Sequence, residues 1–344
     1  MTGGAVTGGE RAVLVRAVNV TKHYPVDGTG APWRSAQVVH AVDAVSLDVY
    51  AGETLGLIGE SGCGKSTLGR CLVRLTDLTS GRVEVAGRDI SALSRRQLRP
   101  LRAQMQMVFQ DPYGSLNPRK RIESTVSLAL RLNPAVRRSE VPARVRVLLE
   151  QVGLRAEHAA RFPHEFSGGQ RQRIGIARAL AADPRLIVAD EPVSALDVSI
   201  QAQVINLLAD LKESHGLTYV FIAHDLSVVR QISDRIAVMY LGRLAEIGPA
   251  QDVVAAPLHP YTEALLASVP VPDVRLRGRE RVELAGDVPS SVTPPTGCRF
   301  HPRCPYATDR CRVEEPALLP RGAAGRAVAC HYPRLTALTA EPGR

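Results

Sequence analysis

Short apolar runs alternate with helix-like segments along the first 250 residues of the chain. Near the N-terminus, residues 13–20 and 42–49 are rich in Val and Leu with polar residues interspersed, which predicts two strands. Because helix-like segments separate several of the later runs, we predict an α/β fold whose core sheet is mostly parallel. Those later runs cover 54–58, 105–109, 186–189, 219–223 and 236–240.

Two parts of the chain depart from this alternation. Residues 120–160 contain no strand pattern and look helical, so we place a helical subdomain at about 115–175. After about residue 250, Pro and Gly become frequent and four of the six cysteines occur. We therefore expect a first domain over 12–250, a small Cys-containing C-terminal domain over 251–335, and flexible termini at 1–11 and 336–344.

Composition places the chain among globular proteins. Its 344 residues favour about two domains, and 45% hydrophobic with 22% charged residues can form a real core. This composition excludes a wholly disordered or collagen-like chain. No run reaches the roughly 18 uncharged apolar residues that a spanning helix needs, and the first residues lack a secretory signal pattern. The cytoplasm is therefore the expected compartment.

The positive charge is concentrated in one segment. The formal net charge is +9, and residues 88–146 carry thirteen basic and four acidic residues, which is +9 on their own. A nucleic acid, an anionic membrane surface and a protein partner would each be attracted to such a segment. Charge alone does not choose among these three partners.

A phosphate-binding sequence follows the apolar run at 54–58. Residues 59–66 match G-x-x-x-x-G-K-[ST] between a predicted strand and a predicted helix. The glycines allow main-chain N–H groups to surround phosphate oxygens, and the helix N-terminus adds partial positive charge. Lys65 is expected to reach the β- and γ-phosphates, and Ser66 to bind Mg²⁺. The predicted binding residues are Gly59, Glu60, Ser61, Gly62, Cys63, Gly64, Lys65, Ser66 and Thr67.

Two carboxylates end the apolar run at 186–189. In open α/β sheets, ligands bind at the carboxyl ends of the strands, which is where Asp190 and Glu191 lie in the sequence. Asp190 suits the Mg²⁺ shell, usually through water, and Glu191 suits polarising the water that attacks the γ-phosphate. Taken alone, paired acids at a strand end are more often a solvated turn, but the phosphate-binding sequence upstream favours the catalytic interpretation.

Phe166-Ser167-Gly168-Gly169-Gln170 resembles the signature motif of ATP-binding cassette (ABC) ATPases. Further motifs of that family occur in order and at suitable spacing. Gln110 in VFQDP resembles the Q-loop, Asp197 in SALD the D-loop, His224 in AHD the switch histidine, and Tyr24 in KHYP the aromatic that stacks on adenine.

The resemblance implies a P-loop ABC nucleotide-binding domain with an antiparallel β subdomain beside the core sheet. It implies ATP and Mg²⁺ as cofactors, Glu191, His224, Lys65 and Gln110 as catalytic residues, and Ser66, Gln110 and Asp190 at Mg²⁺. Each motif occurs once, so a second cassette must complete the nucleotide sandwich. Intact catalytic motifs disfavour a regulator that binds ATP without hydrolysing it. The residues expected to contact ATP besides the phosphate loop are Tyr24, Gln110, Asp190, Ser167, Gly168, Gly169, Gln170 and Asp197.

Three longer segments are similar to ATPases of the peptide and nickel importer family: QDPYGSLNPR at 110–119, EPVSALDVS at 191–199 and HPYT at 259–262. The similarity covers about residues 12–333. It implies an ATP-hydrolysing subunit that powers import of dipeptides or oligopeptides, with nickel import as the alternative.

The same resemblance implies the partners. They are a second ABC ATPase subunit in a heterodimer, two membrane permeases that residues 113–119 contact, and an extracytoplasmic solute-binding protein. A soluble ABC protein acting on nucleic acid is disfavoured, because such proteins commonly carry two cassettes or a long coiled-coil insertion. We therefore expect no nucleic-acid partner and a place on the cytoplasmic face of the membrane, where the basic segment faces the permeases and the anionic leaflet.

Four cysteines in the tail form the pattern C-x₅-C-x₆-C-x₁₈-C, which lacks the C-x₂-C pairs of strong zinc or ferredoxin motifs. Disulfides are disfavoured in a cytosolic chain, and a Pro-rich tail with few aliphatic residues needs a stabiliser other than a core. Similar tails in peptide-importer ATPases can carry a [4Fe–4S] cluster on four cysteines. We predict a metal site with Fe–S favoured over zinc, free thiols remaining an alternative, on Cys298, Cys304, Cys311 and Cys330.

Overall fold

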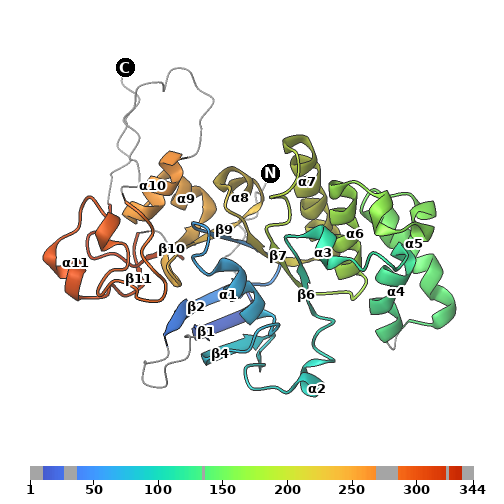
Figure 1. The fold of residues 1–344 in the computed structure, drawn as a ribbon, viewed down its shortest axis with the longest axis horizontal. Helices are drawn as coiled ribbons and strands as arrows, with labels where there is room; N and C mark the ends of the chain where they lie inside the picture. Colours follow the sequence, from blue (N-terminus) through green and yellow to red (C-terminus); the bar gives the residue numbers. More distant parts are fainter. Residues whose placement is uncertain (1–10, 27–36, 134–135, 269–285, 323–324, 335–344) are drawn as a thin grey trace, which may run out of the picture.

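The computed structural model describes residues 11–26, 37–133, 136–268, 286–322 and 325–334. Of the flexible termini predicted at 1–11 and 336–344, only Arg11 lies within the described residues. Two sheets with helices around them form the molecule (Figure 1). Among the described residues, no helix has the length and apolarity that crossing a bilayer requires.

The smaller sheet is antiparallel and has the strand order β2-β1-β4-β5. Its strands are β1 (Val13–Pro25), β2 (Val38–Tyr50), β4 (Ser80–Val85) and β5 (Arg88–Asp89). Alternating valines such as Val15, Val20, Val42 and Val49 bury one face of this sheet. β1 and β2 extend beyond the predicted strands because pairing continues to Pro25 and Val38. Polar residues near those ends are accommodated by main-chain hydrogen bonds, which do not depend on side-chain polarity.

The larger sheet has eight strands in the order β11-β12-β10-β9-β3-β8-β7-β6. The five strands from β9 to β6 are parallel, and every residue of β3, β7 and β8 is buried, as expected for a sheet covered on both faces. The bounds are β3 (Thr54–Ile58), β6 (Met105–Val108), β7 (Leu186–Asp190), β8 (Thr218–Ile222), β9 (Arg235–Tyr240), β10 (Arg243–Pro249), β11 (Leu319–Pro320) and β12 (Ala327–Val328).

Helix α1 (Lys65–Leu72) packs between the two sheets, and its buried Leu68, Cys71 and Leu72 join the core that both sheets share. A Cβ on Gly69 would meet Ile222 and Val188 at less than 3 Å, so α1 lies directly on β7 and β8. The other helices are α2 (Arg95–Leu98), α3 (Pro112–Ser115), α4 (Ile122–Leu132), α5 (Val141–Gln151), α6 (Gly168–Leu180), α7 (Val198–His215), α8 (Leu226–Ile232), α9 (Ala250–Ala255), α10 (Pro260–Ser268) and α11 (Asp309–Val313).

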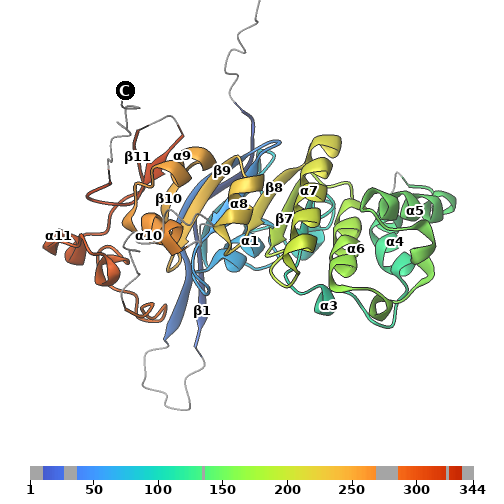
Figure 2. The ribbon, with the colours of Figure 1, turned by 90° about the horizontal axis from the view of Figure 1, so that it is seen from above.

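Helices α4, α5 and α6 form one end of the molecule, and α11 lies at the opposite end in both views (Figures 1 and 2). The predicted α/β fold with a mostly parallel core sheet, an antiparallel β subdomain and a helical insert is confirmed. The cysteine-containing tail is not separated from the core sheet, however. Its strand β12 pairs with β10 through Glu246 and Val328, so the tail extends the larger sheet.

Candidate nucleotide site

The P-loop, residues 59–67, connects β3 to α1 and curves around the side chain of Lys65. The Lys65 ammonium is buried and donates hydrogen bonds to the carbonyl oxygens of Gly59 and Glu60, at 2.7 and 2.9 Å. Only glycine fits at position 64, where φ is +104° and a Cβ would lie 1.9 Å from the carbonyl oxygen of Ala41. The loop therefore holds a buried ammonium group at the N-terminus of α1, a position that attracts phosphate.

Ser66 and Asp190 bring the P-loop and the end of β7 together. The Ser66 hydroxyl donates a hydrogen bond to Oδ1 of Asp190 at 2.6 Å. Burial raises the pKa of Asp190, and the hydrogen bond from Ser66 opposes this shift. A hydroxyl and a carboxylate are oxygen ligands of the kind that Mg²⁺ prefers, and the structure brings together the pair that the sequence predicts at Mg²⁺.

Glu191 contacts two further residues predicted to be catalytic, Gln110 and His224. Gln110, after β6, donates from Nε2 to Oε2 of Glu191 at 2.9 Å, and Nδ1 of His224, after β8, lies 3.3 Å from the same oxygen. Glu191 itself has φ +45°, a strained conformation for a residue with a Cβ, of the kind that persists at functional sites. Gln110 was predicted at Mg²⁺ as well as in catalysis, and here its amide contacts Glu191.

The signature residues lie away from this P-loop. Ser167 caps α6 in a capping box, accepting from the N–H of Gln170 at 3.3 Å while the Gln170 side chain accepts from the N–H of Ser167 at 3.1 Å. Ser167 is exposed, and α6 lies apart from α1 along the long axis (Figures 1 and 2). Asp197 precedes α7 and is exposed, as is Val198, at 81%. These groups face outward.

Comparisons with known proteins agree with this geometry. Residues 42–194 match the ABC transporter family, and residues 245–311 match the oligopeptide/dipeptide transporter C-terminal region. A probable peptide ABC transporter ATP-binding protein of Sinorhizobium fredii, y4tS, is 55% identical over 92% of this chain and 89% of its own length. The chain belongs to the ABC transporter ATPase family.

Two other relatives match this chain over almost the whole of their own length. The oligopeptide transport ATP-binding protein AppF of Bacillus subtilis is 51% identical over 95% of this chain and 99% of its own. Di/tripeptide transport ATP-binding protein DppF of Pseudomonas aeruginosa is 49% identical over 93% and 97%. Among solved structures, the ATP-binding cassette MJ0796, a post-hydrolysis dimer with ADP and Pi, has a TM-score of 0.61 at 31% identity over 69% of this chain and 99% of that one.

As a member of the ABC ATPases, the chain is an enzyme that uses ATP and Mg²⁺. Tyr24, the residue predicted to stack on adenine, is the last residue but one of β1 and is 36% exposed. Nζ of Lys22 lies 4.8 Å from its ring centroid. An exposed aromatic ring can stack on a base, so the adenine role of Tyr24 stays a prediction.

A polar cluster on β1 and β2 was not predicted from the sequence. One ligand atom from each of His23, His40 and Asp43 lies within 4.8 Å of the others, which is the spacing of a metal site. However, the Arg243 and Arg299 guanidiniums both pair with Asp43 and would repel a cation. Burial and then His23 lower the pKa of His40. We assign this cluster no metal.

The four tail cysteines of this ABC ATPase line one small cavity and form no disulfide among the described residues. Burial raises the pKa of Cys298 to about 12 and of Cys330 to about 11. No three of these described sulfurs lie within 4.8 Å of one another. Each neighbouring imidazole is held by a main-chain carbonyl, His301 Nδ1 by Cys298 at 3.0 Å and His331 Nε2 by Glu314 at 2.9 Å.

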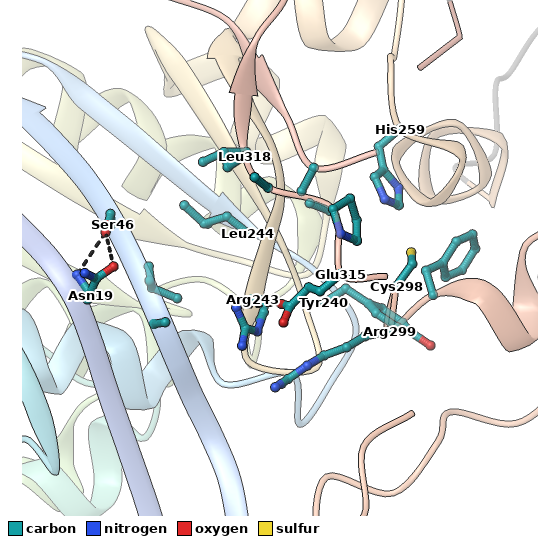
Figure 3. Close-up of a pocket in the computed structure, with 17 residues that line it drawn as sticks. Asn19, Ser46, Tyr240, Arg243, Leu244, His259, Cys298, Arg299, Glu315 and Leu318 are labelled. Carbon is teal, nitrogen blue, oxygen red and sulfur yellow. Dashed lines mark hydrogen bonds and ion pairs between the residues drawn. The ribbon is translucent and has the colours of Figure 1, made fainter. Parts of the chain in front are cut away.

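A cleft of about 470 Å³ lies between the tail and the strands β1 and β2, and Cys298 is part of its lining. Figure 3 shows Asn19 and Ser46 on one wall, with Tyr240, His259 and Cys298 on the other. His259 and Cys298 also line the four-cysteine cavity, so the two spaces share a wall.

Proposed function

We propose that this ABC ATPase powers the import of dipeptides or oligopeptides through a membrane transporter. The observation that carries the proposal is the meeting of Gln110, His224 and Glu191 beside the Ser66–Asp190 pair. The names of the most similar relatives, which describe peptide, oligopeptide and di/tripeptide transport, supply the solute class. Nickel import is the second candidate.

The chemistry follows from the side chains. Lys65 exchanges its main-chain acceptors for phosphate oxygens when ATP binds, and Glu191 orients and polarises the attacking water. His224 and Gln110 lie on Oε2 of Glu191 and fix that carboxylate. Ser66 and Asp190 would hold Mg²⁺, which neutralises charge on the phosphates. Tyr24 stacks on the adenine, while Glu60 and the other P-loop residues contribute main-chain contacts.

A second ATPase subunit completes the site in this proposal. The α6 N-terminus meets the γ-phosphate in the partner's P-loop, where the helix dipole favours negative charge. It comprises the exposed Ser167 together with Gly168, Gly169 and Gln170. Asp197 and exposed Val198 contact the partner beside it. The dimeric structures of MJ0796 support this arrangement, and we favour a heterodimer.

Two membrane permeases bind the helical end of the molecule in this proposal, on the cytoplasmic face of the membrane. Tyr113 is 65% exposed and stacks on the Arg171 guanidinium, whose carbon lies 3.8 Å from its ring centroid, so its outer face is presented rigidly. On α4, Leu128 and Leu132 are 57% and 62% exposed at helical spacing. An extracytoplasmic solute-binding protein delivers the solute, and no nucleic acid is bound.

The four-cysteine cavity holds a [4Fe–4S] cluster in this proposal. The four sulfurs line one cavity, so each iron of such a cluster could take one cysteine. Four thiolates would equally complete a tetrahedral zinc site. Zinc remains the alternative.

We also propose that residues 12–250 form the ATPase domain, with its helical subdomain at about 115–175, and that 251–335 form the peptide-importer-type domain.

The test is reconstitution. The chain is expected to co-purify with two permeases, and the complex in liposomes should hydrolyse ATP faster when a solute-binding protein loaded with a dipeptide is added. Stimulation by a nickel-loaded protein alone would assign the second candidate. A chain that binds no permease would contradict both.

A further inference from the structure

Glu60 of the P-loop is held by the tail. Arg303 donates to both of its carboxylate oxygens, from Nη1 to Oε2 at 2.8 Å and from Nη2 to Oε1 at 3.1 Å. The main-chain N–H of Glu60 donates to the hydroxyl of Tyr261 at 2.8 Å, and its carbonyl accepts from Lys65. One P-loop residue thus links the lysine of the phosphate site to two side chains that lie more than 200 positions away.

Both anchoring side chains are fixed by their surroundings. Tyr261 is fully buried, and its ring packs on Tyr240 and Phe300, with centroids 4.6 and 5.4 Å away. Arg303 is 8% exposed and ends the short turn His301–Arg303, directly before Cys304. A bidentate guanidinium–carboxylate pair in such a buried place has little freedom to rearrange.

We propose that Arg303 and Tyr261 are positioning residues that set the P-loop geometry for ATP, so that the tail controls nucleotide affinity. This inference goes beyond the proposed function. A peptide importer could work even if its tail played no part in nucleotide binding. The main-chain N–H groups of the P-loop bind phosphate only when the loop keeps its shape. Loss of either anchor would therefore weaken ATP binding more than it slows hydrolysis of bound ATP.

The test is a double-mutant cycle on the full-length chain. Arg303→Gln and Glu60→Gln are each expected to raise the Kd for Mg²⁺-ATP about tenfold, and the double variant should be no weaker than either single variant. The catalytic constant at saturating ATP should change by less than about threefold. Tyr261→Phe, which removes only the hydroxyl, should raise the Kd by a smaller factor.

Matched variants control for general damage. Arg16→Gln breaks a pair with Asp48 that has the same bidentate geometry, at 3.0 and 3.1 Å, but is more exposed and lies away from the P-loop. Tyr219→Phe removes a buried hydroxyl that makes no hydrogen bond among the described residues. Both should leave the Kd unchanged. If Arg303→Gln does not fold, Arg303→Lys is the second variant. It keeps the positive charge but cannot form the bidentate pair with Glu60, so it should still raise the Kd.

Unchanged affinity in folded Arg303 variants, or strictly additive effects of the two substitutions, would overturn the proposal. Because binding is measured on this chain alone, without permease or peptide, its result is independent of whether the transported solute is a peptide.

Discussion

The side-chain amide of Gln110 donates a hydrogen bond to Oε2 of Glu191, 2.9 Å away, although 81 positions separate the two residues. The contact spans the ends of two neighbouring parallel strands, β6 and β7. It places a neutral donor on the carboxylate that we assign to water activation, and His224 approaches the same oxygen from β8. Two side chains therefore orient the carboxylate to which we assign water activation.

Glu191→Gln is expected to lower steady-state phosphate release at least about a hundredfold, because an amide cannot accept the proton of the attacking water. The Kd for ATP should remain within about threefold of the wild-type value, and ATP-dependent dimerisation should persist. Glu213→Gln, an exposed change on α7, is the matched control. Near-normal phosphate release in Glu191→Gln would remove Glu191 from its assigned role.

Asp190→Asn is expected to stabilise the ligand-free protein while removing the stabilisation by Mg²⁺-ATP. Burial raises the pKa of Asp190 above its usual 3.8, so the folded state disfavours the charged form. The stability that the protonated Asp190 carboxyl contributes is fully present below a pH of about 3.8. It is lost as the pH rises through the raised pKa, because the carboxyl then becomes charged in a buried place. The melting-temperature gain of Asp190→Asn should therefore grow with pH.

Calorimetry between about pH 4 and pH 8 measures this trend, with Asp210→Asn, an exposed change on α7, as the control. A melting-temperature difference that is constant across this range contradicts the argument.

Ser167→Ala is expected to abolish ATP-dependent dimerisation while costing little stability. Removing an N-cap costs about 1 kcal/mol, which lowers the melting temperature of a domain of this size by about 2–4 °C. The dimer loses more, because the hydroxyl and the helix N-terminus face the partner's γ-phosphate in the proposed sandwich. Light scattering with ATP in the Glu191→Gln background measures this effect, and dimers of normal mass would argue against the sandwich.

Tyr24→Ala is expected to raise the Kd for ATP about fivefold or more, since stacking of a base on an aromatic ring contributes about 1–3 kcal/mol. Tyr24→Phe keeps the ring and should bind ATP normally. Equal binding by both variants would show that the adenine does not rest on this residue.

Anaerobic purification should yield four irons and four sulfides per chain, and Cys304→Ser should lower that content. Stoichiometric zinc, or protein without metal, contradicts the cluster.

Much of the site was predictable because its chemistry is local in sequence. The P-loop pattern fixes Lys65 and Ser66 within one turn, and the apolar strand before Asp190 places that carboxylate at the sheet edge where the phosphate loop also ends. The mostly parallel core sheet was predictable as well, because short apolar runs alternate with helix-like segments along the chain. Predicted strand positions held to within a few residues for the core strands.

The contacts of the tail were not predictable in this way. Glu60 and Arg303 are 243 positions apart, and neither charge stands in a local pattern that names its partner. The strand β12 has two residues, too few for any periodicity. The HPYT segment, which resembles the importer family, did include Tyr261, but a sequence pattern gives no hint that its hydroxyl accepts from the P-loop.

Uptake of a labelled dipeptide tests the central claim most directly. Liposomes would hold the complete transporter, with this chain as one ATPase subunit and its solute-binding protein added outside. The account predicts uptake that requires ATP and that disappears when this chain carries Glu191→Gln. Uptake that continues with Glu191→Gln, or transport of nickel without any transport of peptide, would contradict it.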